Sequence, residues 1–425
     1  MNAPRRVAIV AGNRIPFARS NSAYAEATNQ DMLTAALSGL VEKSGLKGAR
    51  LGDVVAGAVI NHVKDWNIAR ECVLGSGLAP ETPGLTLQRA CGTSLEAAII
   101  VANRIALGQY DAGIAAGTDT TSDAPIVYRD GLRKQLLRAM RAKTMGAKLG
   151  AFAGIRFRDL RPGTPGVVEP RTGMSMGQHC EQMVKTWKIS RQAQDELALV
   201  SHQRAAAAWG EGFFADLVSP FAGLAFDNNV RKDSTLAKLG SLKPAFDRSA
   251  AGTLTAGNST PLTDGAAAVL LASEAWANER GLAIQAFMTH SEVAAVDFVS
   301  GKEGLLMAPA YAVPRMLSRA NLKLSDFDYY EIHEAFAGQV LCTLAAWESA
   351  EFCRDKLGLA GPLGSIDRAK LNVKGGSLAV GHPFAATGAR VLATAAKLLA
   401  KKGSGRVLIS VCTAGGMGVT AIVER

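Results

Sequence analysis

The chain has 425 residues, of which 48% are hydrophobic and 20% are charged. This composition excludes a disordered protein, because a chain of this size and apolar content can bury a sizeable core, and it favours an α/β globular protein of two or three domains. No segment reaches the roughly 18 apolar residues that a membrane span needs. The six scattered cysteines form no CxxC pair and no export segment precedes the first predicted strand, so we expect a reduced, cytoplasmic location.

The formal net charge of +10 is unevenly distributed along the chain. Residues 129–161 contain ten basic residues and two acidic ones, a net charge of +8. This segment either binds the phosphates of a small molecule, lies on a membrane or partner subunit, or forms a solvated helix face. Leu132, Leu136 and Met140 recur every four residues with Leu137 beside them, a pattern typical of a helix that lies on an anionic surface.

The first elements follow a β–α–β order. Residues 7–11 and 54–60 are short β-branched runs, and residues 31–45 between them have the apolar periodicity of an amphipathic helix that stops at glycine. This order favours a largely parallel sheet covered on both faces.

A second pattern occurs twice. Residues 94–107 form a predicted helix closed by Gly108 and followed by a strand at 111–119, and residues 386–402 form a helix closed by Gly403 and followed by a strand at 406–412. The repetition indicates two similar halves. The segment between them, to about residue 255, differs in charge and turn content and contains a long helix with Ser190 as its predicted N-cap, so we interpret it as an insertion.

Four residues are candidates for chemistry: Cys91, His333, His382 and Cys412. Each lies at the end of a predicted strand beside a turn, where ligands gather in open α/β sheets. The dipole at a helix start is expected to lower the pKa of the Cys91 thiol. Each residue also has a structural interpretation, since free cysteines and lone histidines are often buried core groups. A zinc site is disfavoured because no ligand pair has the short local spacing usual for zinc.

Cysteine with a histidine base is a coherent nucleophilic pair. A hydrolase would have no need of a second cysteine, which can move a proton to or from carbon.

The motifs as a set resemble the thiolase family over nearly the whole chain. They are VAIVAGNRIPFAR at the amino terminus, Cys91, GNSTPLTDGAAAV at 257–269, HEAFA at 333–337, GGSLAVGHPFAATGAR at 375–390 and CTAGGMG at 412–418. His333 and Thr263 stand where many thiolases have asparagine, and both variants are similar to the β subunits of trifunctional fatty-acid oxidation complexes. Gly-Thr-Ser after Cys91 and Ala414 in the final turn depart from the common pattern.

The resemblance implies a five-layered αβαβα thiolase fold from two similar halves with an inserted loop domain. The expected parts are an amino-terminal half at 1–123 plus 256–283 with the nucleophile, a loop domain at 124–255 covering CoA, and a carboxyl-terminal half at 284–425 with the acid–base groups. The resemblance further implies catalytic Cys91, His333, His382 and Cys412, oxyanion-hole amides of Cys91 and Ala414, and substrate or CoA contacts at Ser259, Thr260, Phe336 and Met174. It implies no metal and no tightly bound cofactor, with CoA as a substrate.

The expected activity is that of a 3-ketoacyl-CoA thiolase, an acetyl-CoA C-acyltransferase of fatty-acid β-oxidation that forms a Cys91 acyl-enzyme. The alternatives are a short-chain acetyl-CoA C-acetyltransferase and, more distantly, a non-enzymatic acyl-CoA carrier. A decarboxylating ketoacyl synthase is disfavoured by Cys412. Expected partners are acyl-CoA and CoA, a second copy in a homodimer or dimer of dimers, a possible hydratase/dehydrogenase α subunit, and a membrane contacted through 129–161, but no nucleic acid.

Overall fold

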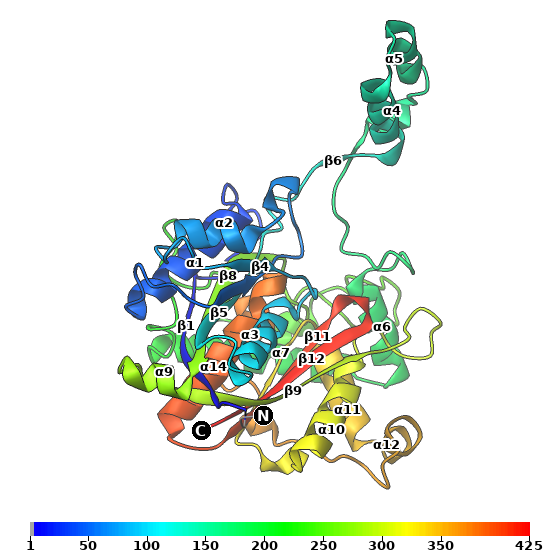
Figure 1. Cartoon of the computed structure of the whole chain (residues 1–425). Coiled ribbons are helices and arrows are strands. Elements are labelled where there is room, and N and C mark those ends of the chain that lie inside the picture. Colours follow the sequence, from blue (N-terminus) through cyan, green and yellow to red (C-terminus); the bar gives the residue numbers. More distant parts are fainter. Residues whose placement is uncertain (1–3) are drawn as a thin grey trace.

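The computed structural model describes residues 4–425 and contains one extended mixed sheet with helices on its faces (Figure 1). The strand order is β10-β11-β12-β9-β1-β8-β5-β3-β4, with β2 paired to β8. The first part of the chain forms β1 (Val7–Arg14), β2 (Ala18–Arg19), α1 (Asn29–Lys43), β3 (Asp53–Ala56), α2 (Ile68–Gly75), β4 (Gly84–Thr86), α3 (Thr93–Ala106) and β5 (Ala112–Asp119). Later segments complete this half with β8 (Thr263–Ser273) and α9 (Glu274–Glu279).

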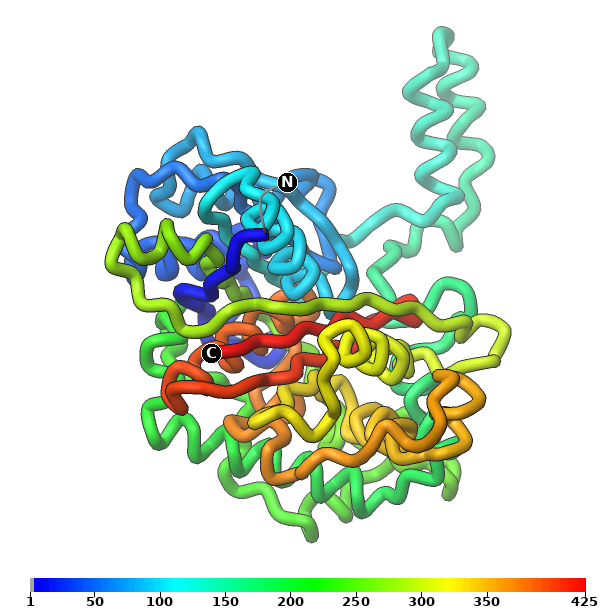
Figure 2. Tube along the Cα trace, turned by 60° about the horizontal axis from the view of Figure 1, so that its bottom comes forward, coloured from blue at the N-terminus to red at the C-terminus, as the bar shows by residue number. Residues whose placement is uncertain are grey.

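The second half repeats the strand order of the first without a counterpart of β4, since β9-β12-β11-β10 corresponds to β1-β8-β5-β3. It comprises β9 (Ala286–Ala295), α10 (Ala308–Ala320), β10 (Tyr329–Ile332), α11 (Ala337–Glu348), α12 (Ala350–Leu357), α13 (Ser377–Val380), α14 (Thr387–Lys402), β11 (Arg406–Thr413) and β12 (Met417–Glu424). The two halves of the sheet meet where Ala8 and Ile9 of β1 pair with Phe287 and Ala286 of β9. Figure 2 shows the yellow-green β9 running beside the red β12 of the same half.

The buried clusters show five layers. Alternate residues of β1, β5 and β8 pack on α1 and α2 on one face, and on α3 and α14 on the other. The opposite face of α3 and α14 packs on β11 and β12, whose outer face is covered by α10 and α11. The predicted five-layered αβαβα thiolase fold from two similar halves is therefore confirmed.

Two local predictions were wrong. The sheet is not largely parallel: only β3–β4, β3–β5 and β10–β11 are parallel among the pairs of the main sheet within residues 4–425. The reason is that β12 follows β11 through a tight turn and must return antiparallel, while β8 enters between β1 and β5 from a distant segment. The strand expected at 54–60 also ends at Ala56, where the chain leaves the sheet.

The segment between β5 and β8 has two parts. Residues 127–163, called the helical hairpin below, comprise β6 (Val127–Tyr128), α4 (Asp130–Arg141), α5 (Met145–Phe152) and β7 (Pro162–Gly163), and they stand away from the body (Figure 1). Then α6 (Met176–Thr186), α7 (Arg191–Gly210) and α8 (Leu236–Gly240) lie against the body. Ser190 caps α7 as predicted, accepting a hydrogen bond from the Ala193 amide. The three-part division of the chain stays a prediction.

A search of residues 4–425 finds no helix with the length and hydropathy that crossing a membrane requires.

Helices α3 and α14 approach closely because Gly388 lies at their contact. A methyl group at Gly388 would overlap the backbone amide and side chain of Leu95. The Ala389 amide also donates to Ser94 Oγ at 2.8 Å, which joins the starts of the two helices.

We expect Gly388→Ala to lower the free energy of unfolding by about 1–3 kcal/mol, because neither helix backbone can yield to the added methyl. Urea denaturation measures this loss. Gly150→Ala in α5 is the matched control, since open space surrounds that position and alanine favours a helix. Equal stability of Gly388→Ala and wild type would contradict the close approach.

Candidate active site

Cys91 lies in a tight turn immediately before α3. Ala90 has a φ of 44°, an unusual value for a residue with a side chain, and this turns the chain so that Cys91 precedes the helix start. The Gly-Thr-Ser sequence after Cys91 has a structural reason. Gly92 has no room for a side chain, because a methyl there would lie 2.6 Å from Val419 Cγ2. Thr93 Oγ1 accepts a hydrogen bond from the Arg89 amide and donates one to the Ala90 carbonyl. Ser94 Oγ accepts a hydrogen bond from the Ala389 amide of α14.

His382 lies in the loop between α13 and α14. Gly381 before it has a φ of 98°, which favours glycine, and Thr387 in the first turn of α14 hydrogen-bonds to His382 Nδ1 at 2.6 Å. The loop is tied to the amino-terminal half because Asp119 accepts the Ala385 amide at 2.7 Å as well as the amides of Val59 and Ile60. The imidazole is therefore held by both halves of the molecule.

His333 follows β10 directly. Its amide continues the parallel ladder by donating to the Ser410 carbonyl of β11 at 2.8 Å, and its Nδ1 pairs with Ser377 Oγ at 2.8 Å. The side chain is 1% exposed. Its Nε2, like that of His382, has no protein partner among the described residues.

Cys412 lies near the end of β11, directly before the turn that leads into β12. Gly415 and Gly416 have φ values of 75° and 70°, whereas Ala414 is not in the left-handed region, so alanine is tolerated there. The Gly415 amide donates to the buried Glu169 carboxylate at 2.6 Å. Glu169 thereby anchors this turn to the segment between the helical hairpin and α6.

The structure brings all four predicted catalytic residues together. Cys91 Sγ and one ring nitrogen each of His333 and His382 lie within 4.8 Å of one another, and the two imidazole centroids are 4.1 Å apart. Cys412 lies close enough that the Cys91 thiol contributes to raising the Cys412 pKa, after the larger effect of burial. Of the four, only Cys91 keeps part of its surface accessible.

The prediction that the helix start lowers the Cys91 pKa was wrong. Burial raises that pKa to about 12, while hydrogen bonds from the backbone amides of Ala414 and Cys91 itself offset part of the effect. These are the two amides expected to form the oxyanion hole. Burial also lowers the pKa of His382 to about 3, with the nearby Arg390 charge adding to the shift. The resting pair is therefore a neutral thiol and a neutral imidazole.

The spacing of Cys91, His333 and His382 would also suit a metal ion. Their surroundings do not. Metal-binding histidines usually donate their second ring nitrogen to a carboxylate or carbonyl, whereas here both Nδ1 atoms face hydroxyl groups. The cationic Arg390 nearby also lowers both imidazole pKa values, an electrostatic environment that repels a cation.

The predicted substrate contacts lie around this cluster. Ser259 pairs with Phe336 in an antiparallel bridge, and the Thr260 amide donates to the Ala335 carbonyl at 3.1 Å, so both run along the loop that holds His333. The Ser259 hydroxyl is buried and has no protein partner within residues 4–425. Met174 accepts the Glu169 amide through its carbonyl and thus belongs to the segment that anchors the turn after Cys412.

Comparisons with known proteins agree with this geometry. The profile "Thiolase, N-terminal domain" matches residues 7–275, and "Thiolase, C-terminal domain" matches residues 283–425. The chain belongs to the thiolase family.

Its relatives among known proteins cover nearly the full chain. The 3-ketoacyl-CoA thiolases of Yersinia enterocolitica and Yersinia pestis are 42% and 43% identical over 99% of this chain and 97% of their own length. Among solved structures, the acetyl-CoA acetyltransferase of Bacillus anthracis superposes with a TM-score of 0.83 at 29% identity, covering 100% of both chains. Human mitochondrial 3-ketoacyl-CoA thiolase gives 0.81 at 26% identity over 99% of each chain.

Sequence reasoning missed the residues that support this thiolase site. Asp119, Glu169, Ser377 and Arg390 are buried polar residues that act through other groups. Ser377 and Arg390 lie inside the motif GGSLAVGHPFAATGAR, where an arginine on an otherwise apolar helix face was the available signal. The role of Glu169 could not be recognised in the sequence, because its hydrogen-bond partner Gly415 is 246 residues away.

A neutral resting thiol predicts how Cys91 reacts with iodoacetamide. The alkylation rate should rise about tenfold per pH unit up to about pH 9, because the reactive thiolate remains a minor species throughout that range. Mass spectrometry of the Cys91 peptide measures the rate, and the five buried cysteines serve as internal controls. A rate that levels off near neutral pH would instead indicate a preformed thiolate–imidazolium pair.

Proposed function

We propose that this thiolase is a 3-ketoacyl-CoA thiolase, which cleaves 3-ketoacyl-CoA with CoA to give a shortened acyl-CoA and acetyl-CoA in fatty-acid breakdown. The observation that supports it best is the convergence of two thiols and two imidazoles in one buried cluster. The reaction needs a nucleophile and a proton donor to carbon, and the two cysteines supply one each. The names of the Yersinia and human relatives support the substrate class.

The first half of the reaction transfers the acyl group to the enzyme. His382 Nε2 accepts the Cys91 proton as the sulfur attacks the C3 carbonyl, which matches the neutral resting pair. The C2–C3 bond then breaks and leaves an acyl thioester on Cys91 and the enolate of acetyl-CoA. Cys412 protonates the enolate carbon and becomes a thiolate. The oxyanion on the acyl carbonyl is bound by the amides of Cys91 and Ala414.

The second half returns the protons. The Cys412 thiolate accepts the proton of an incoming CoA thiol, the CoA sulfur attacks the acyl thioester, and the released Cys91 sulfur regains its proton from His382. The enzyme ends in its starting state, and the kinetics are ping-pong. His382 and His333 stabilise the thioester oxygen of the acetyl unit, while Ser259, Thr260, Phe336 and Met174 are proposed to contact substrate. CoA is a substrate, so we propose no tightly bound cofactor.

The roles of the two cysteines predict opposite effects on the half-reactions. Cys91→Ala should abolish acyl-enzyme formation, whereas Cys412→Ala should still be acylated by acetyl-CoA but lose cleavage of acetoacetyl-CoA by about 10²-fold or more. Trapped acyl-enzyme is measured by mass spectrometry and cleavage by CoA-dependent loss of the substrate. The buried Cys353→Ala, outside this site, is the control. Equal loss of both steps in Cys412→Ala would indicate a structural role.

The same assay with 3-ketoacyl-CoAs of graded length decides between the proposed function and its alternative. Activity that persists with long chains supports a 3-ketoacyl-CoA thiolase. Activity confined to acetoacetyl-CoA would instead assign the acetyl-CoA C-acetyltransferase function named for the Bacillus anthracis structure.

We also propose that the chain forms a homodimer through β4. This strand ends the sheet and pairs with β3 on one side only among the described residues. Leu85 and Leu87 next to this edge are only partly buried. An unpaired apolar edge is suited to pairing with a second copy. Binding to a hydratase/dehydrogenase α subunit and a cytoplasmic location remain expectations.

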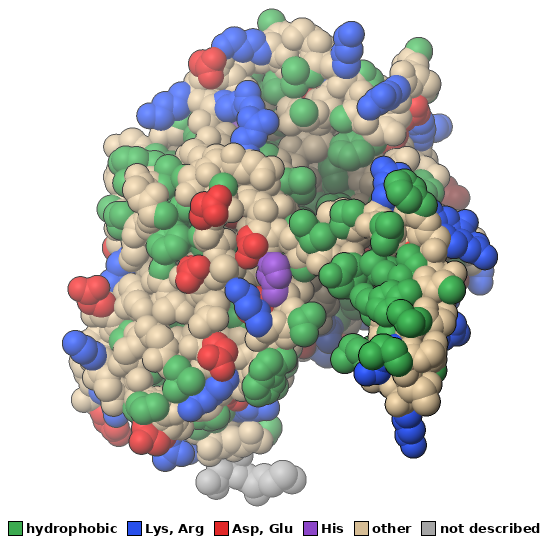
Figure 3. All heavy atoms as spheres, turned by 90° about the horizontal axis from the view of Figure 1, so that it is seen from above, with side chains coloured by type: hydrophobic (Ala, Val, Ile, Leu, Met, Phe, Trp, Pro, Cys, Tyr) green, Lys and Arg blue, Asp and Glu red, His purple; other side chains and the backbone are tan. Residues whose placement is uncertain are grey.

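The helical hairpin is proposed to contact an anionic membrane. Of the predicted stripe on α4, Leu132 is buried, Leu136 and Leu137 are half-buried, and Met140 is exposed, so the stripe is only partly available for contact. The exposed apolar side chains are instead spread over both helices and the strands at the hairpin base: Ile126, Val127, Tyr128, Met140, Met145, Leu149, Phe152, Phe157 and Leu160. Figure 3 shows apolar side chains gathered on this projection with lysine and arginine side chains along its margin.

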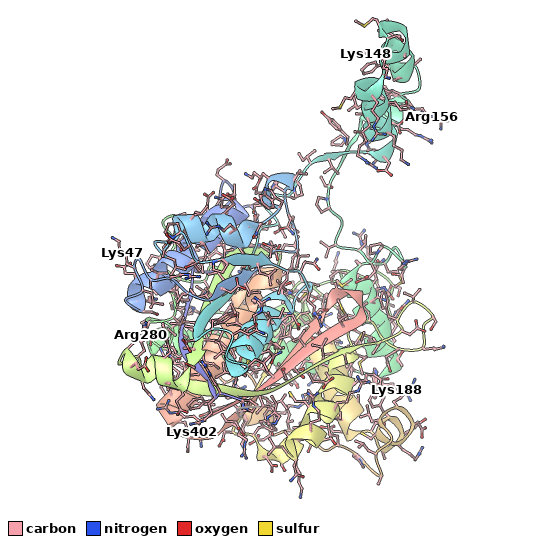
Figure 4. All side chains as sticks on the ribbon, in the orientation of Figure 1. Lys47, Lys148, Arg156, Lys188, Arg280 and Lys402 are labelled. Atoms are coloured by element: carbon pink, nitrogen blue, oxygen red, sulfur yellow. The ribbon has the colours of Figure 1, made fainter. Side chains whose placement is uncertain are left out.

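The basic residues of the helical hairpin are available for such contact. Asp130 pairs with Arg133 and Lys134, but no salt bridge within residues 4–425 involves Arg138, Arg141 or Lys148. Lys148 and Arg156 project from the hairpin in Figure 4, far from the labelled Lys47 and Lys188 on the body. Each cation near an anionic surface contributes about 1 kcal/mol, so the net charge of the segment is sufficient for binding.

Reversing two of these charges should weaken membrane binding. We expect Arg138→Glu with Arg141→Glu to reduce cosedimentation with phosphatidylcholine–phosphatidylglycerol vesicles by at least about tenfold, with thiolysis unchanged. Lys47→Glu with Lys188→Glu is the matched control on the body. The role at an anionic surface would be contradicted if wild type bound vesicles of phosphatidylcholine alone equally well, or bound neither kind of vesicle. The hairpin would then be expected to contact a protein partner instead.

A further inference from the structure

Arg390 is a buried cation directly behind the catalytic cluster. It lies in the first turn of α14, is 4% exposed, and donates from Nη2 to Ser377 Oγ at 2.8 Å. Two buried glutamates nearby, Glu331 and Glu334, partly oppose the lowering of the Arg390 pKa by burial, although burial also raises the pKa of Glu331 itself to about 8. Glu334 is itself held by Ser201 Oγ and by the side-chain amide of Asn372. The hydrogen bond to Ser377 is the one that the guanidinium makes among the described residues, since its Nε has no protein partner there.

Ser377 transmits that orientation to His333. Its Oγ accepts from Arg390, since a guanidinium can only donate, and the same oxygen lies 2.8 Å from His333 Nδ1. The hydroxyl has a single hydrogen, and His333 Nδ1 is its one acceptor among the hydrogen bonds of the described residues. Donation from Ser377 Oγ–H to Nδ1 is the arrangement that uses this hydrogen, and a neutral His333 then carries its own hydrogen on Nε2.

The remaining ring nitrogen of His333 is Nε2, in a buried imidazole that belongs to the catalytic cluster. It has no protein partner within residues 4–425, and the ring lies 4.1 Å from that of His382. The cationic Arg390 lowers the pKa of His333 after the larger effects of burial and of His382, which keeps the imidazole neutral. His333 therefore offers an N–H donor beside His382, whose own Nε2 must accept the proton of Cys91. Two adjacent imidazoles thus have opposite hydrogen-bonding roles.

We propose that Arg390 and Ser377 are positioning residues that hold His333 as the Nε2–H tautomer, so that it donates to the thioester oxygen of the acetyl unit when the carbon–carbon bond is broken or formed. This inference rests on the proposed function and adds the residues that determine the state of one of its oxyanion donors. It also predicts which half-reaction depends on Ser377, because acylation of Cys91 by acetyl-CoA uses the other oxyanion site, at the amides of Cys91 and Ala414.

The test uses Ser377→Ala in the full-length protein. We expect kcat for cleavage of acetoacetyl-CoA to fall about 10²-fold with KM within about twofold, while acetyl transfer from acetyl-CoA to Cys91 keeps its wild-type rate. Ser377→Thr, which keeps the hydroxyl, should restore most of the cleavage activity. Ser76→Ala removes another buried hydroxyl, at the end of α2, and should leave both rates unchanged.

A double substitution separates a tautomer effect from a packing effect. In a His333→Asn background the side-chain amide offers an N–H donor that needs no tautomer, so adding Ser377→Ala should lower kcat by no more than about twofold. An undiminished loss in that background, or an equal loss of acetyl transfer in the single variant, would overturn the inference. Failure of the proposed function is distinguishable, because wild type would then cleave no 3-ketoacyl-CoA longer than acetoacetyl-CoA, whatever the effect of Ser377→Ala on acetoacetyl-CoA.

Discussion

The catalytic cluster depends on the close approach of α3 and α14 between the two halves of the sheet. Gly388 lies against the Leu95 backbone, Gly117 lies against the Ala385 carbonyl, and Ser94 accepts the Ala389 amide. These contacts hold the turn that carries Cys91 against the loop that carries His382. Because protein interiors are close-packed and poorly compressible, a small displacement at this crossing would be transmitted to the thiol and the imidazole. The amino-terminal half thus provides Cys91, and the carboxyl-terminal half provides His333, His382 and Cys412.

The second constraint is electrostatic. Cys91, His333, His382 and Cys412 gather in a region where burial raises the pKa of the thiols and lowers that of the imidazoles. All four groups are consequently neutral at rest, so charge appears only during the reaction, where oriented amides and N–H groups stabilise it. Arg390 is a buried cation beside the cluster, near Glu331 and Glu334, and Ser377 links it to His333.

Many of the helices and strands could be predicted from the sequence, because the patterns that indicate them are local. Helices such as residues 387–402 are revealed by apolar periodicity and a closing glycine, and Ser190 by its capping chemistry. The sheet direction could not be predicted in the same way. A β–α–β order implies parallel neighbours only when consecutive strands pair, and β8 enters from a segment more than 140 residues after β5 begins. The Cys91 pKa was misjudged because a helix dipole is visible in sequence and the depth of burial is not.

The sequence by itself determined the fold family, the four reactive residues and the basic hairpin segment, since each depends on residue type and spacing along the chain. Tertiary structure alone decided which charge states those residues hold and which groups orient them. Glu169 reaches the turn after Cys412 across 246 residues, and Arg390 reaches His333 through Ser377, on a separate helix. Hydrogen bonds and desolvation act over a few ångströms in space. The folded core brings together groups that are far apart in the sequence, and nothing in the sequence around them indicates that they meet.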